Sequence, residues 1–190
     1  MGSKTICLCC LFFVVLFTSP FVILITLSYV GVKPRFYIQE IYIPSLNNSN
    51  THNNATNLNT SIFIDLKFKR VVAHVPLRYE DVNITLYYGS NRSFGAVGSY
   101  VVAGFSQGKK KTARRRAVVE ARGLPWEDAF EKISGGSAVA LAVELATKYK
   151  LRRCDEGNCY YTKPKTVVVA ADLVVDASGL EVSKKPIRLH

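Results

Sequence analysis

Histidine is scarce in this chain of 190 residues, which contains only His52, His74 and His190. Their spacing fits no zinc-ligand pattern, and they supply no credible pair of nucleophile and base. A Gly-x-Ser-x-Gly elbow, a phosphate-binding loop and a His-Glu-x-x-His helix are also missing from the sequence. We therefore expect a protein without catalytic activity, without a metal site and without a cofactor.

Charged residues are absent from Thr5 to Val32, a run of 28 positions. A helix of that length, rising 1.5 Å per residue, exceeds the roughly 30 Å hydrocarbon core of a bilayer. The alternative is a cleavable signal peptide, whose apolar region is about 7–15 residues long and ends at a small-x-small site. This run is longer than the apolar region of a signal peptide, and the residues at its carboxyl-terminal end match the cleavage site poorly. We therefore predict a cytosolic stub at 1–5 and an uncleaved transmembrane signal-anchor helix over 6–32.

The charges that flank this run do not orient it, since Lys4 and the amino terminus balance Lys33 and Arg35. Asparagines give a direction instead. With 10 Asn and 25 Ser and Thr in 190 residues, chance predicts 10 × 25/190, about 1.3 Asn-x-Ser/Thr acceptors. Glycans are added in the lumen, so the excess of acceptors predicts a single-pass type II protein whose carboxyl-terminal part is extracellular. Three of the acceptors lie in a segment that can also be interpreted as a polar tether. The five predicted N-glycosylation sites are Asn47, Asn54, Asn59, Asn83 and Asn91.

Five cysteines divide between the two sides of this predicted span. Cys154 and Cys159 bracket Asp-Glu-Gly-Asn, a turn-forming set, so a disulfide across a hairpin is expected in an oxidising compartment. Cys7, Cys9 and Cys10 lie at the cytosolic end of the run. They are candidates for S-acylation, and an equally good interpretation is that they are small apolar residues of a membrane helix.

Composition divides the rest of the chain into a linker, one domain and a tail. Residues 33–61 are predicted to form an Asn-rich, glycosylated linker, whose first residues, up to Ile43, alternate as an edge strand would. Residues 62–181 form the predicted domain, which is large enough for one core. Residues 182–190 form a predicted basic tail.

Apolar residues recur at every second position within 62–181. Examples start at Ile62, at Val82 and at Val139, and 167–175 is apolar on both faces apart from Asp172. Strands of this kind, separated by Gly- and Ser-rich turns, are typical of an antiparallel β-sandwich, so we predict an all-β fold. One short helix is expected over Pro125–Ile133, where proline begins the segment and acidic residues follow.

The order of several short motifs resembles the plant NDR1/HIN1-like proteins, which carry the LEA-2 (late embryogenesis abundant group 2) domain. After the anchor come Leu66-Lys-Phe, Val82-Asn-Ile-Thr-Leu-Tyr-Tyr-Gly and Gly104-Phe-Ser-Gln-Gly, followed by two Val-rich strands. The resemblance spans about residues 6–180. Tyr79-Glu-Asp stands where the family has Asn-Pro-Asn, which indicates a divergent member.

This resemblance implies a fibronectin type III-like sandwich on a plasma-membrane protein without catalytic activity. It implies a role in plant defence against pathogens, including hypersensitive-response signalling, and some relatives are associated with plasmodesmata or with adhesion between wall and membrane. Partner proteins are not identified by the sequence. Paired Tyr87 and Tyr88 are interpreted as strand packing.

Positive charge is the feature most suited to binding. From Ile62 onward the chain has 22 Lys and Arg and 13 Asp and Glu, which gives a net charge of 22 − 13 = +9. The extracellular topology excludes nucleic acid as a partner, and leaves wall pectin or anionic lipid. A strand edge protected by cations from aggregation is the alternative. The candidates for polyanion contact are Lys109, Lys110, Lys111, Arg114, Arg115 and Arg116.

Two other functions stay open. An apolar-ligand or lipid-binding sandwich would need a cavity of several hundred cubic ångström, lined by aliphatic side chains, between its sheets. Both facing layers look filled by Val, Leu, Ile and Phe, which favours a packed core. A lumenal glycosyltransferase is the weakest alternative, because the domain is small and has no paired-carboxylate metal motif.

Overall fold

The computed structural model divides the chain into two compact units, Met1–Lys33 and Pro34–His190. In the first unit, residues 15–22 are helical. No helix within the described residues combines the length and the apolar character needed to cross a membrane, so the span over 6–32 stays a prediction. The structure describes residues 15–22, 33–47, 59–70, 75–90, 92, 95–108, 112–155, 157–183 and 185–190.

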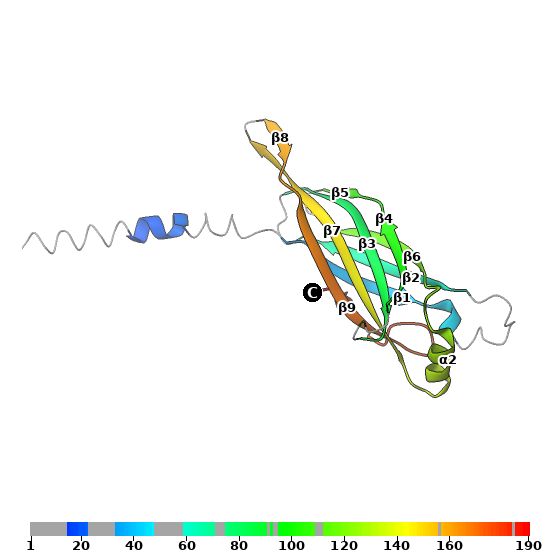
Figure 1. Ribbon diagram of the computed structural model, residues 1–190. Helices are drawn as coiled ribbons and strands as arrows, with labels where there is room; N and C mark the ends of the chain where they lie inside the picture. Colours follow the sequence, from blue (N-terminus) through cyan, green and yellow to red (C-terminus); the bar gives the residue numbers. More distant parts are fainter. Residues whose placement is uncertain are drawn as a thin grey trace, which may run out of the picture. The chain divides into compact units, whose positions relative to one another are not determined.

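The second unit contains two antiparallel sheets (Figure 1). The four-stranded sheet has the order β10-β1-β2-β6. Its elements are β1 (Arg35–Tyr42), β2 (Ser61–Lys69), β6 (Ala113–Glu120) and β10 (Ile187–Arg188), and the short 3-10 helix η1 (Pro44–Leu46) follows β1.

The six-stranded sheet is built around the two long strands β3 and β7, which pair with each other. β4 and β5 pair with β3, and β8 and β9 pair with β7. Its strands are β3 (Leu77–Tyr88), β4 (Ala96–Val102), β5 (Phe105–Gln107), β7 (Val139–Asp155), β8 (Asn158–Tyr161) and β9 (Lys165–Val175). The all-β, antiparallel prediction is thereby confirmed, and the expected helix corresponds to α2 (Trp126–Ser134).

A buried layer of alternating side chains joins the two sheets. Phe36 of β1 and Phe68 of β2 meet Tyr79 of β3, with ring centroids 6.2 and 5.4 Å from that of Tyr79. In β1 the alternation skips one position after Ile38, where a bulge shifts the register and returns Ile41 to the core. β3 has a similar shift between Tyr79 and Val82. The unequal spacings of apolar residues in the sequence are explained by these bulges.

The second bulge covers the residues that differ from the family's Asn-Pro-Asn. Here the backbone N–H of Gly104 donates to Asp81 Oδ1 at 2.9 Å, which ties β3 to the turn between β4 and β5. A Cβ at Gly104 would lie 2.9 Å from the carbonyl oxygen of Tyr79, so this close approach requires glycine. The acidic residue therefore has a structural role at this position.

The folded unit is larger than the expected 62–181 at both ends. At its start, β1 pairs with β2 from Arg35 to Tyr42, so this part of the expected linker belongs to the sheet. At its end, the expected basic tail contains β10 and the buried Leu189, whose N–H donates to the Phe36 carbonyl at 3.0 Å. The tail also pairs with β9, because Ala170 and His190 exchange two backbone hydrogen bonds of 2.9 Å.

Candidate functional site

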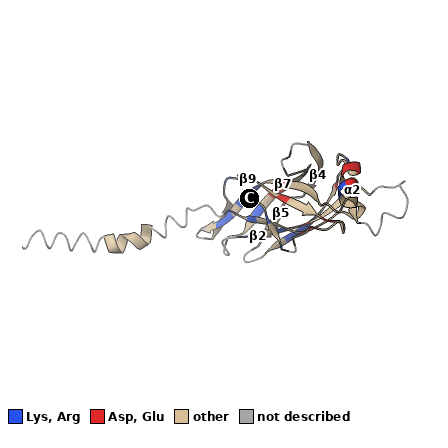
Figure 2. Ribbon diagram, turned by 90° about the horizontal axis from the view of Figure 1, so that it is seen from below, with Lys and Arg blue, Asp and Glu red and all other residues tan. Residues whose placement is uncertain are grey.

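The described cations and carboxylates are unevenly distributed between the two ends of the sandwich, although the sequence also places Asp155 and Glu156 between the cations of β7 and the start of β8. We call the end at which β1 and β9 begin the basic end, and the end that carries α2 the acidic end. Figure 2 shows acidic residues on α2 and basic residues toward the opposite end. The exposed cations of the basic end include the eight residues Arg35, Lys69, Arg78, Arg114, Arg152, Arg153, Lys163 and Lys165. The carboxylates of the acidic end are Glu120, Glu127, Asp128, Glu131, Asp176 and Glu181.

Strand pairing explains why cations distant in sequence meet at one end. Arg35, the first residue of β1, lies opposite Lys69, the last residue of β2. In the other sheet Arg78 of β3 lies opposite Lys150 of β7. The preceding residue of β7, Tyr149, lies opposite Lys165 of β9. The aromatic contacts of Phe36, Phe68 and Tyr79 hold these strand ends together.

The cations of the two ends differ in their partners. At the acidic end Arg122 pairs with Glu120 at 2.6 Å, and Lys132 pairs with Asp128 at 2.9 Å. Lys150 is an exception at the basic end, since it is paired with Glu80 at 2.9 Å. Within the described part of the chain, none of the eight exposed cations of the basic end forms a salt bridge. Their charge is therefore available to an external anion.

The arginine triplet that the sequence singled out is split by strand alternation. Arg114 and Arg116 are exposed on the outer face of β6, where they lie opposite Lys67 and Asp65. Arg115 is only half-exposed, and its guanidinium carbon lies 4.1 Å from the centroid of the Phe105 ring. Two of the three arginines therefore belong to the solvent-facing surface. The preceding Lys109, Lys110 and Lys111 lie outside the described residues.

A buried polar network lies beneath the basic end. The Tyr79 hydroxyl donates to Gln107 Oε1 at 3.1 Å, and Gln107 Nε2 donates to the Phe68 carbonyl at 3.0 Å. Arg70 is nine-tenths buried and donates to the Gly108 carbonyl. Burial lowers the pKa of Arg70 and raises the pKa of Tyr79. This network fixes the strand ends rather than contacting solvent.

At the acidic end, Tyr88 attaches α2 to the sheets. Its hydroxyl donates to Asp128 Oδ2 at 2.6 Å, and Lys132 Nζ donates to the same carboxylate. The hydrogen bond from Tyr88, followed by the one from Lys132, lowers the pKa of Asp128. Burial raises the pKa of Tyr88 itself. Tyr88 is 3% exposed, which agrees with its interpretation as a packing residue.

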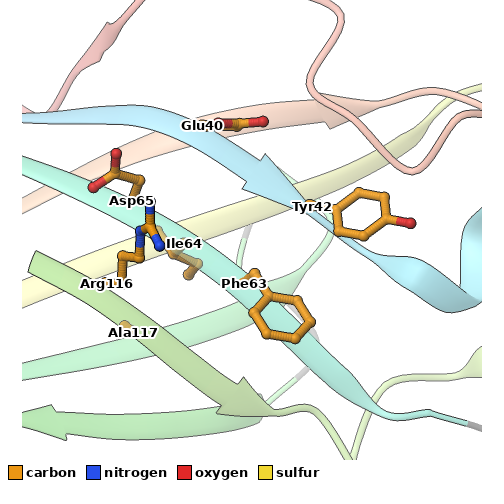
Figure 3. A pocket seen from close by; sticks show the side chains of 7 residues that line it. All are labelled: Glu40, Tyr42, Phe63, Ile64, Asp65, Arg116 and Ala117. Carbon is orange, nitrogen blue, oxygen red and sulfur yellow. The ribbon is translucent and has the colours of Figure 1, made fainter.

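A hollow of about 230 Å³ lies on the outer face of the four-stranded sheet (Figure 3). Its mixed lining differs from the aliphatic cavity between the sheets that an apolar-ligand function requires. Asp65 Oδ1 is buried there and accepts no hydrogen bond from any described residue. The lining residues are Glu40, Tyr42, Phe63, Ile64, Asp65, Arg116 and Ala117.

The cysteine pair and three of the predicted glycan acceptors lie in the described residues. Cys154 and Cys159 face each other across the β7–β8 hairpin and form a disulfide with an S–S distance of 2.00 Å. Asn59 and Asn83 are exposed, and Asn47 is half-exposed at the end of η1. The remaining predicted sites, Cys7, Cys9, Cys10, Asn54 and Asn91, lie outside the described residues.

Most of the basic end was missed by the sequence analysis, which identified Arg114 alone among its eight exposed cations. The others are single or paired cations at the ends of separate strands, and only the register brings them together. A weak signal exists at Arg152 and Arg153, which immediately precede Cys154. Because the two cysteines predict a hairpin, Arg152 and Arg153 could be expected on a projecting element.

Comparison with known proteins places these features in a family context. No protein-family model matches the chain. A crystal structure of a protein from Archaeoglobus fulgidus aligns with 77% of this chain and 96% of its own, at 9% identity and a TM-score of 0.34. Protein NDR1 of Arabidopsis thaliana is 28% identical over 192 residues, which cover 99% of this chain and 83% of that protein. This similarity along nearly the whole chain supports its membership in the NDR1/HIN1-like family.

Proposed function

We propose that this protein is a non-enzymatic interaction protein of the plant defence response. Residues 6–32 anchor it in the plasma membrane as a single-pass type II protein, and its sandwich contacts anionic groups outside the cell through the basic end. The NDR1/HIN1-like resemblance supports the defence role, with hypersensitive-response signalling or wall adhesion as its setting. The observation that carries the contact is the uneven distribution of charge, since eight exposed cations at the basic end form no salt bridge with any described residue, whereas Arg122 and Lys132 at the acidic end are paired with carboxylates.

Replacing Arg152 and Arg153 by glutamine is expected to weaken binding to an anionic polymer about 30-fold. Each cation close to an anionic surface contributes about 1 kcal/mol, and about 1.4 kcal/mol corresponds to a factor of ten. The measurement uses the full chain in uncharged detergent and immobilised polygalacturonate, over a series of salt concentrations. Binding of the parent protein should fall as salt rises, because exposed charges are screened.

Arg92 and Arg122 provide the matched control. Each is paired with a carboxylate, Arg92 with Glu144 at 3.0 Å and Arg122 with Glu120 at 2.6 Å. Replacing both by glutamine lowers the net charge from +11 to 11 − 2 = +9, as the first pair of substitutions does. The control should bind like the parent. Equal weakening of both double variants would assign the binding to net charge rather than to the basic end, and a parent that does not bind would overturn the contact.

The topology is checked independently by enzymes applied to intact cells. Glycosidase digestion should increase the mobility of the full chain, because Asn-x-Ser/Thr acceptors are modified only in the lumen. Protease added outside the cells should remove the 34–190 unit. A chain without glycans, whose sandwich is protected from external protease, would reverse the orientation and remove the extracellular function.

A further inference from the structure

The β7–β8 hairpin is a braced projection at the basic end (Figure 1). All four residues of β8 are exposed, while the disulfide between Cys154 and Cys159 closes the hairpin near its tip. At its base, Thr162 and Leu151 exchange two hydrogen bonds of 2.9 and 3.0 Å. The side chains of the hairpin are thus presented on a defined support.

Aromatic and cationic side chains are paired across this hairpin. Tyr160 is 52% exposed and lies opposite Arg153, while Tyr161 is 44% exposed and lies opposite Arg152. The guanidinium carbon of Arg78 lies 5.9 Å from the centroid of the Tyr161 ring. Tyrosine has an apolar ring and a polar tip, and arginine has an apolar stem and a charged head. Both side chains suit the boundary between headgroups and acyl chains.

The chain enters the sandwich at the same end. β1 begins at Arg35, and the next residue, Phe36, contacts Tyr79, which in turn contacts Tyr149 near the start of the hairpin. Arg35 is three residues beyond Val32, where the uncharged run ends. Three residues span at most roughly 10 Å, which is about the Debye length at physiological salt. A bilayer spanned by 6–32 would therefore lie within electrostatic reach of the basic end.

We propose that the β7–β8 hairpin contacts the anionic bilayer in which the chain is anchored, with Tyr160 and Tyr161 at the level of the lipid headgroups and Arg152 and Arg153 facing lipid phosphates. The inference rests on the proposed function, because the anchor supplies the bilayer. The short connection between the anchor and β1 favours the bilayer, rather than a soluble wall polymer, as the partner of the hairpin. The acidic end then faces away from the membrane.

Tryptophan fluorescence tests this orientation, because the chain has a single tryptophan, Trp126, in α2 at the acidic end. The full chain is reconstituted in bilayer discs that contain anionic lipid brominated on the acyl carbons nearest the headgroup. Tyr160→Trp adds a reporter that preserves the interfacial character of the residue. Tyr100→Trp, at a position of β4 that is 38% exposed, is the matched control.

Bromine is expected to remove most of the emission added by Tyr160→Trp and to leave that of Tyr100→Trp and of the parent unchanged. In the Tyr160→Trp background, replacing Arg152 and Arg153 by glutamine should restore much of the lost emission. Full emission from the Tyr160→Trp variant in the anionic discs, or quenched Trp126 in the parent, would overturn the hairpin contact. If the hairpin contact is overturned while the protein still binds polygalacturonate and its sandwich is extracellular, the proposed function is retained. A reversed topology would instead remove the proposed function first.

Discussion

Replacing Phe68 by alanine is expected to lower the free energy of unfolding by about 3–5 kcal/mol, because a large buried ring leaves a cavity that the surroundings fill only in part. Phe68 is fully buried, and its ring centroid lies 5.4 Å from those of Phe36 and Tyr79 and 5.0 Å from that of Phe105. The substitution thus removes three aromatic contacts, of which those with Tyr79 and Phe105 join the two sheets. Urea unfolding of the full chain in uncharged detergent, followed by the fluorescence of Trp126, measures the loss.

Phe63→Ala is the matched control, since it removes the same side chain from the opposite face of the same strand. Phe63 is 42% exposed and stacks on Tyr42 with centroids 6.4 Å apart. A half-exposed ring with one aromatic partner among the described residues should contribute less than about 1 kcal/mol. Similar losses from both variants would contradict the assignment of the two faces of β2.

Strand content and fold class could be predicted because β2, β3 and β7 repeat with a period of two over long segments. This local pattern determines which face of each strand is apolar, and burial of that face then forces the two sheets together. The α2 helix was equally predictable, since Glu127 and Asp128 occupy its first turn.

The limits of the domain and most of the basic end could not be predicted, because both depend on contacts between distant residues. β10 has two residues and no periodicity that marks a strand, and it is defined by Tyr37, which lies opposite Arg188. In the same way, Arg35 and Lys69 become neighbours only through the register of β1 and β2. A run such as Arg114–Arg116 looks like one surface in sequence, whereas the pleat turns Arg115 to the other face.

Deleting Pro186–His190 is expected to destabilise the protein by about 4–9 kcal/mol, since the loss combines a buried leucine with three backbone hydrogen bonds. Leu189 is 3% exposed, and the lost hydrogen bonds join it to Phe36 and join His190 to Ala170. Domains of this size are typically stable by about 5–15 kcal/mol. Urea unfolding followed by Trp126 fluorescence should therefore place the midpoint of the deletion variant far below that of the parent.

Loss of the closing segment should also change how the chain associates, because β1 and β9 then present unpaired N–H and C=O groups at two sheet edges. Leu189→Ala separates this effect from burial, as it removes the side chain and keeps the backbone hydrogen bonds. Leu180→Ala, at a residue that is 38% exposed, is its control. Leu189→Ala should lose about 2–5 kcal/mol and remain dispersed, whereas the deletion variant should aggregate in light scattering. A deletion variant with the stability and dispersion of the parent would contradict the role of residues 186–190 in closing the sandwich.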